Sequence, residues 1–150
     1  MYTSNTAYAD PTYEELLAIY RSNSGRKFYD PIIRDISTVL FQLGIKASLK
    51  GYKYLRSAIK ITIEDPSAVE RITKMIYPTV AREYGSTSTR VERSMRSAIE
   101  KVDPENVWSK KVLIHSWDHF TNAQFIATVA EYIKMNPIEG FVSDDEYSPA

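Results

Sequence analysis

The chain has 150 residues, with 19 lysines and arginines against 19 acidic residues and no cysteine. This length suits one domain with short tails, and a core of this size needs neither disulfides nor a thiolate metal site. The longest apolar stretches are a few residues, and no basic patch leads into one at the N-terminus. We therefore predict no membrane span, no secretory signal and a cytoplasmic location.

The zero net charge argues at first against a nucleic-acid partner, but the charges are unevenly distributed. Residues 46–101 carry twelve lysines and arginines and only six acidic residues, and the rest of the chain is correspondingly acidic. A basic middle of this kind is typical of a surface that faces a polyanion, although ordinary solvated helices also show it.

Apolar residues recur at spacings of three and four, and alternating β-branched runs are absent. This pattern predicts an all-α fold, a bundle-like domain of about six helices. The expected helices, with approximate bounds, span residues 12–20, 31–43, 51–64, 65–76, 78–84, 88–101, 103–113 and 121–135.

Cap signals set these bounds. Capping-box patterns open the first and the last helix, at Thr12 and Thr121. The pairs Asp65-Pro66 and Asp103-Pro104 each predict a helix start, and Gly44 predicts an end. We therefore divide the chain into an N-terminal extension with a short helix (1–30), a helical domain (31–136) and an acidic, disordered tail (137–150).

Residues 78–101 have the form of a helix-turn-helix, a short helix joined to a longer one by a tight turn. The small Ala81 allows the two helices to approach closely, and Gly85 suits a left-handed turn. Val91 is then expected to face back into the pair. The cap of the second helix is left open among three hydroxyls, those of Thr87, Ser88 and Thr89.

A helical wheel at about 100° per residue divides the helix over 88–101 into two faces. The apolar face holds Val91, Met95, Ala98, Ile99 and Val102. Arg93 lies opposite, between Arg90 and Arg96, with Ser97 and Lys101 beside them. Glu92 borders the core, where it is placed to brace an arginine or to accept from a cytosine amino group.

Arginine suits a base-reading role because its planar fork donates two hydrogen bonds to guanine O6 and N7. A good contact of this kind discriminates by about 1–3 kcal/mol. Lysines outside the helix are expected to contact phosphates, namely Lys50 and Lys74 together with Lys53 and Lys60. Three arginines on an exposed helix are often only a solvated face, but the turn and the charge segregation favour double-stranded DNA as partner.

Several unusual strings occur in one order between Ile32 and Lys134. They are Leu43-Gly44-Ile45, Lys50-Gly51-Tyr52, Tyr54-Leu55-Arg56, Ala58-Ile59, Ile72-Thr73-Lys74, Tyr77-Pro78, Arg90-Val91-Glu92-Arg93, Ala98-Ile99, Thr121-Asn122, Phe125-Ile126-Ala127 and Val129-Ala130. In this respect the chain resembles the C-terminal DNA-binding effector domain of the bacterial sporulation response regulator, stage zero sporulation protein A.

The resemblance implies a six-helix, sequence-specific transcription regulator, in sporulation or a related developmental programme, that binds promoter boxes as a homodimer or as tandem copies. It also implies that Glu92, Arg93 and Arg96 read bases. The chain departs from the family at Ser97 and Ser48, where the family has histidine, and it matches poorly over 103–120. Since about 30 residues precede the domain, we expect no phosphorylated receiver domain, and no control by phosphorylation, within this sequence.

Other chemistry is not predicted. His115 and His119 are four residues apart, but no third metal ligand is evident, and the acidic residues 144–146 lack the rest of a calcium-loop pattern. No phosphate loop, nucleophile elbow or carboxylate pair occurs, so we expect no enzyme, cofactor, metal or small-molecule substrate. The alternative function is a protein-interaction module that pairs with a full-length relative and modulates it, or a competitor that occupies the same DNA boxes.

Overall fold

The computed structural model of the chain describes residues 30–113 and 120–137. Six α-helices and two short helical segments of other types form in these ranges, which contain no strand, so the predicted all-α class is confirmed. The helix predicted from Thr12, the pair of His115 and His119, and the predicted acidic tail beyond Pro137 lie outside the described residues.

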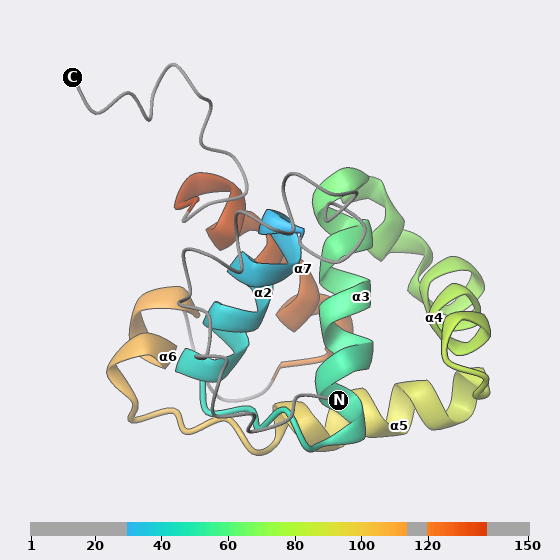
Figure 1. The fold of residues 1–150 in the computed structure, drawn as a ribbon, viewed down its shortest axis with the longest axis horizontal. Coiled ribbons are helices and arrows are strands. Elements are labelled where there is room, and N and C mark those ends of the chain that lie inside the picture. Colours follow the sequence, from blue (N-terminus) through green and yellow to red (C-terminus); the bar gives the residue numbers. More distant parts are fainter. Residues whose placement is uncertain (1–29, 114–119, 138–150) are drawn as a thin grey trace, which may run out of the picture. The chain divides into compact units, whose positions relative to one another are not determined.

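One helix lies at the centre of the arrangement (Figure 1). It is α3, Lys50–Glu64, which packs against most of the other elements, and α5 crosses its N-terminal end. The elements are α2 (Pro31–Gln42), α3 (Lys50–Glu64), η2 (Pro66–Arg71), η3 (Ile72–Ile76), α4 (Tyr77–Glu83), α5 (Ser88–Ile99), α6 (Val107–Val112) and α7 (Asn122–Met135).

The core forms where the apolar stripes of these helices meet, because burying apolar surface is the main force that drives helices together. Most of its large, fully buried side chains come from α2, α3, α5 and α7, and these include Ile36, Leu40, Leu55, Ile59, Met95, Phe125, Ile126 and Ile133. All five residues of the apolar face predicted for the helix over 88–101 are buried in the core. The helical wheel therefore predicted the inner face of this helix correctly.

Helices α2 and α4 end in the same way. Gly44 and Gly85 both have positive φ angles, +91° and +61°. Beyond them, the Ile45 N–H donates to the Leu40 carbonyl at 3.0 Å and the Ser86 N–H donates to the Ala81 carbonyl at 2.8 Å. These are Schellman closures, which turn the chain sharply away from the helix. The roles predicted for both glycines are confirmed.

The prediction of one α-helix over residues 65–76 is wrong. Asp65 does cap the segment, since its carboxylate accepts the Ser67 N–H at 3.1 Å. The chain then forms a 3₁₀ helix and a π helix, which meet at Arg71 with backbone angles of φ −117° and ψ 38°. Apolar spacing does not separate helices whose hydrogen bonds span three, four or five residues, so the sequence pattern missed the change.

Helix α6 is shorter than predicted and does not start at Asp103-Pro104. The Asp103 carboxylate instead accepts the Glu105 N–H at 2.9 Å in a local turn. Asn106 is the cap, accepting the Trp108 N–H at 2.7 Å and donating from its amide to the Gln42 carbonyl at 3.0 Å. This contact with the end of α2 sets the helix start. The capping box of Thr121 and Gln124 is confirmed at the start of α7.

Gly51 brings α3 against α5 more closely than any other residue would allow. A Cβ atom at this position would lie 2.2 Å from the Ser94 carbonyl oxygen and 2.7 Å from the Ala98 Cβ. Both distances are far below van der Waals contact, and the first involves backbone, which does not move aside. The two helices therefore touch main chain to main chain at this point.

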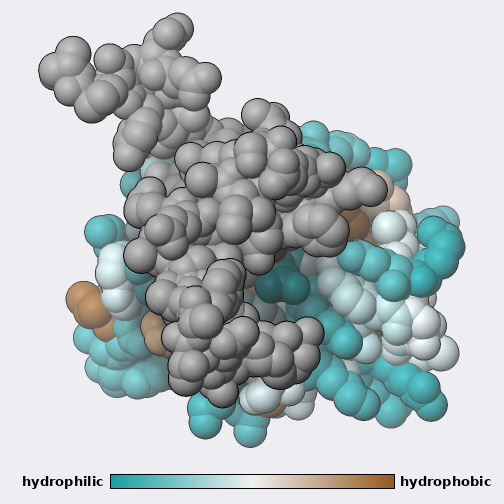
Figure 2. All heavy atoms as spheres, in the orientation of Figure 1, coloured by the Kyte–Doolittle hydropathy of each residue, from teal (hydrophilic) through white to brown (hydrophobic). Residues whose placement is uncertain are grey.

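The exposed apolar side chains among the described residues are few. Phe41, Val107 and Met135 are each more than two-thirds exposed. Figure 2 shows a mainly hydrophilic face over the described residues, including the lower edge along which Figure 1 draws α5. In the described part of the chain, no helix combines the length and apolarity that crossing a membrane requires.

We predict that Gly51→Ala destabilises the fold by about 1–3 kcal/mol, because the added methyl group overpacks the contact of α3 with α5. The sign of the change in stability is informative, because replacing glycine by alanine within an ordinary helix stabilises the helix by about 1 kcal/mol. Urea unfolding followed by circular dichroism measures the change.

Lys50→Ala is the matched control, because Lys50 is the exposed neighbour in the same helical turn. It is expected to change the free energy of unfolding by less than about 0.5 kcal/mol. A Gly51→Ala variant as stable as the wild type would show that α3 and α5 are not in main-chain contact.

Candidate nucleic-acid interface

Helices α4 and α5 form the short helix, turn and longer helix that the sequence predicted. Ala81 and Val91 are buried where the two helices meet, and the Schellman turn at Gly85 joins them. The Thr87 hydroxyl accepts the Arg90 N–H at 3.2 Å, so Thr87 is the cap among the three hydroxyls considered. The start of α5 is thus fixed by side-chain and main-chain hydrogen bonds.

The outer face of α5 carries the predicted arginines. Arg90, Arg93, Arg96 and Ser97 are all exposed, while Val91 and Met95 on the opposite face are fully buried. Within residues 30–113 and 120–137, no carboxylate forms an ion pair with Arg90 or Arg93. Two guanidinium groups are therefore presented to solvent from a rigid helix.

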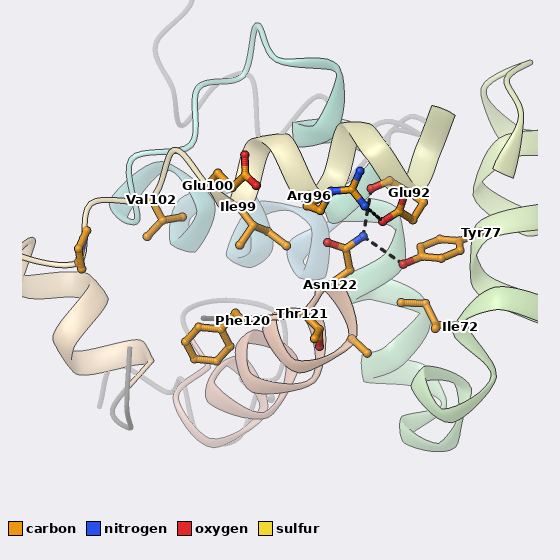
Figure 3. A pocket seen from close by; sticks show the side chains of 12 residues that line it. Ile72, Tyr77, Glu92, Arg96, Ile99, Glu100, Val102, Phe120, Thr121 and Asn122 are labelled. Atoms are coloured by element: carbon orange, nitrogen blue, oxygen red, sulfur yellow. Dashed lines mark hydrogen bonds and ion pairs between the residues drawn. The ribbon is translucent and has the colours of Figure 1, made fainter. Parts of the chain in front are cut away.

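Arg96 differs from the other two arginines because it is held by its own helix. Its guanidinium forms an ion pair with the Glu92 carboxylate one turn earlier (Figure 3). The two side chains are 52% and 32% exposed, so the pair is only half shielded from solvent. Of the two roles left open for Glu92, the structure contains the bracing contact.

Three of the predicted lysines, Lys50, Lys74 and Lys101, are placed differently from one another. Lys50 opens α3 directly before Gly51, whose nearest neighbours are Ser94 and Ala98 of α5. Lys74 is exposed in η3, which packs against α4. Lys101 is exposed two residues beyond the end of α5 at Ile99, where its N–H closes a tighter turn onto the Ala98 carbonyl at 3.0 Å.

Lys53, another of the predicted lysines, extends from α3 toward the turn between α4 and α5. The Lys53 ammonium is 5.0 Å from the ring centre of Tyr84, and the Tyr84 hydroxyl is 3.0 Å from the Ser57 hydroxyl. Tyr84 directly precedes Gly85, so this stack places a positive charge beside the turn.

Behind α5, sequence reasoning missed a buried polar bridge. The side-chain amide of Asn122 donates to the Tyr77 hydroxyl at 3.0 Å and to the Glu92 main-chain carbonyl at 3.1 Å. Asn122 is 7% exposed and Tyr77 is 8% exposed. An asparagine directly after a capping threonine was the only local signal, and it does not indicate which distant groups the amide reaches.

An open pocket of about 640 Å³ lies between α5 and the start of α7 (Figure 3). Apolar side chains of Ile72, Ile99, Val102 and Phe120 and polar side chains of Tyr77, Glu92, Arg96, Thr121 and Asn122 are among those that line it. The Glu92–Arg96 pair and the Asn122 bridge thus border the same hollow. Among the described residues, no group of three His, Cys, Asp or Glu side chains is placed to hold a metal ion.

Tyr77 has a perturbed acidity. Burial raises the pKa of its phenol above the ordinary value, and the Asn122 hydrogen bond and the charge of Arg96 offset this only in part. The neutral phenol is therefore the form that the fold favours.

One comparison with known proteins bears on this arrangement. The family model described as "Sporulation initiation factor Spo0A C terminal" matches residues 36–133. The matched range is about two thirds of the chain, and it runs from α2 into α7. It includes Gly51, the whole of α4 and α5, and Asn122.

We predict that Tyr77 makes stability fall at alkaline pH. A phenol whose pKa is raised by folding contributes stability that is present below about pH 10 and is lost as the pH rises through its folded value. Tyr77→Phe cannot ionise, so its free energy of unfolding should decline less than that of the wild type between about pH 9 and about pH 11.

Urea unfolding of both proteins at several pH values measures this difference. At neutral pH, Tyr77→Phe is expected to be less stable by about 1 kcal/mol, because one buried hydrogen bond is lost. A gap between the two proteins that stays constant up to about pH 11 would contradict the raised pKa.

Proposed function

The chain belongs to the family of the C-terminal domain of sporulation initiation factor Spo0A, a family of DNA-binding regulator domains, and from this premise we propose how it reads DNA. In the proposal, α5 enters the major groove of a duplex and the protein recognises a specific sequence. The observation that carries the proposal is the outer face of α5, with three exposed arginines on a helix whose opposite side is buried.

Base reading is assigned to the centre of this face. Arg93 is exposed on α5, and its planar fork can donate two hydrogen bonds, to guanine O6 and N7. Arg96 lies beside it in a position braced by Glu92. Arg90, in the first turn of α5, contacts either a base or a phosphate, because the first residues of a recognition helix approach both. The neighbouring Ser97 adds a short hydroxyl.

We assign to the flanking lysines the contacts that raise DNA affinity without selecting a sequence. Lys50 directly precedes Gly51, where α3 meets the middle of α5, and its side chain is exposed, so we assign it a phosphate beside the reading face. Lys74 and Lys101 lie on segments before and after the two helices, where a duplex backbone would pass. Contacts of this kind neutralise phosphates and release counterions, which makes binding depend on salt.

The proposal extends to assembly on DNA. Two copies, as a homodimer or side by side on tandem boxes, would place two α5 helices about one duplex turn or a multiple of it apart. Size-exclusion chromatography with and without duplex separates this arrangement from the alternative. A stable dimer that ignores DNA would favour the protein-interaction module over the DNA reader.

We predict that Arg93→Ala relaxes sequence choice. Selection on random duplexes defines a preferred site, and binding to that site and to a scrambled duplex gives a selectivity ratio. Loss of one bidentate contact should lower this ratio by about 1–3 kcal/mol, and it should do so at one base position.

Arg71→Ala is the matched control. It removes the same charge, but Arg71 lies in η2, past the far end of the roughly 22 Å long α3, where it pairs with Asp65 at 3.2 Å. Its ratio should equal that of the wild type. A wild type without sequence preference at about 150 mM salt would defeat the proposal.

We predict that Lys50→Ala weakens binding without changing sequence choice. Affinity for the selected and the scrambled duplex should fall by the same factor, and the slope of log affinity against log salt should decrease by about 1. Fluorescence anisotropy over a salt series measures both quantities. Lys134→Ala, at the exposed end of α7, is the control and should leave the slope unchanged. A Lys50→Ala variant with the wild-type slope would remove Lys50 from the interface.

A further inference from the structure

We infer that Asn122 is a positioning residue for base reading, because its buried amide ties the main chain of α5 to α4 and α7 and thereby sets the rotation of α5 about its axis. The inference rests on the proposed function of α5 as the base-reading helix. Asn122 is buried behind that helix and is assigned no contact with DNA.

The two N–H groups of one amide are divided between two other helices. One donates to the hydroxyl of Tyr77, the first residue of α4, at 3.0 Å. The other donates to the Glu92 carbonyl, in the second turn of α5, at 3.1 Å. Asn122 is itself the first residue of α7. Because the amide is buried, water does not readily replace either bond, and breaking them leaves unpaired polar groups.

The acceptor on α5 belongs to the helix backbone. A bond to a main-chain carbonyl restrains the helix itself, whereas a bond to a long side chain would restrain only that side chain. The carbonyl also belongs to Glu92, whose carboxylate braces Arg96 (Figure 3). The bridge therefore ends on the same residue whose carboxylate orients a proposed base reader.

Side-chain packing does not fill the space on the side of α5 that faces the start of α7. The pocket lies between α5 and the start of α7, so no continuous layer of apolar side chains fills the space there. On its other side α5 is pressed against α3 at Gly51. A helix held closely along one line still turns about its axis, and a recognition site requires its groups to be held within about 0.5 Å and 10–20°. The Asn122 bridge adds a point of attachment on the pocket side of α5, beyond its contacts with α3 and α4.

Asn122→Asp tests the inference. The aspartate has the same shape and is favourable at the first position of a helix, so α7 should still form. It has no N–H to donate, and its charge repels the Glu92 carbonyl. We expect the selectivity ratio between the selected and the scrambled duplex to fall at least about fivefold, with the loss at the base pairs that Arg96 and Glu92 read.

Asn136→Asp is the matched control. It makes the same chemical change at the other end of the same helix, where the Asn136 amide donates to the Tyr132 carbonyl at 3.0 Å. Both variants add one negative charge, so a general loss of DNA affinity cancels in the comparison. The control should keep the wild-type ratio even if its melting temperature falls, because an aspartate is unfavourable at a helix C-terminus.

A double-mutant cycle separates positioning from a merely structural role. In an Arg96→Ala background, the further change Asn122→Asp should have no additional effect at the base pairs that Arg96 reads. A merely structural role would lower the melting temperature and scale both affinities equally, leaving the ratio unchanged, and this outcome would overturn the inference.

Two further outcomes are decisive. If the wild type prefers a sequence and folded Asn122→Asp keeps the full ratio, the positioning role is wrong and the proposed function stands. If the wild type has no preference, both fail. If Asn122→Asp does not fold, Tyr77→Phe decides, since it removes only the hydroxyl that holds the amide: a lower ratio supports the inference and an unchanged ratio overturns it.

Discussion

The arrangement of this domain depends on the contact of α3 with α5 at Gly51. Interhelical distances are usually 8–10 Å and depend on the side chains between the helices. Here the missing side chain lets the backbone of α3 lie directly against the Ser94 carbonyl, where even a methyl group would come within 2.2 Å. This approach seats Met95 and Ala98 of α5 in the core. Because that side of α5 is committed to the core, its arginine side is left facing solvent.

Three separate structural features then define where α5 lies. The Schellman turn at Gly85 and the Thr87 cap fix the residue at which it begins. The contact at Gly51 fixes its distance from the central helix, and the amide of Asn122 reaches it from α7. Each feature comes from a different part of the chain. A surface that must match another molecule benefits from such support, because loosely held groups lose specificity before they lose stability.

Much of this was predictable from local pattern. The two faces of α5 follow from a period near 3.6 residues, and the positive φ angles at Gly44 and Gly85 follow from glycine at a helix end. The rest depends on groups far apart in sequence. The start of α6 depends on an amide that reaches Gln42, and Asn122 acts on Tyr77 and Glu92. Gly51 lies in a helix that the sequence predicted. The need for glycine there depends on Ser94, which is more than 40 residues away in the sequence.

The arginines of α5 are not equivalent. Arg90 and Arg93 lack a carboxylate partner within the described residues, so each loses up to about 2 kcal/mol of rotamer entropy when a ligand orders it. Arg96 has less freedom to lose, because Glu92 lies one turn before it in the favourable order of acid then base. An exposed pair of this kind is worth only about 0.3–0.5 kcal/mol, so it directs the guanidinium without preventing its exchange onto a base. The pair uses Oε2 of Glu92, which leaves Oε1 to accept from a cytosine amino group. The bracing contact is therefore compatible with the proposed base-reading role of Glu92, because the carboxylate has one oxygen for each.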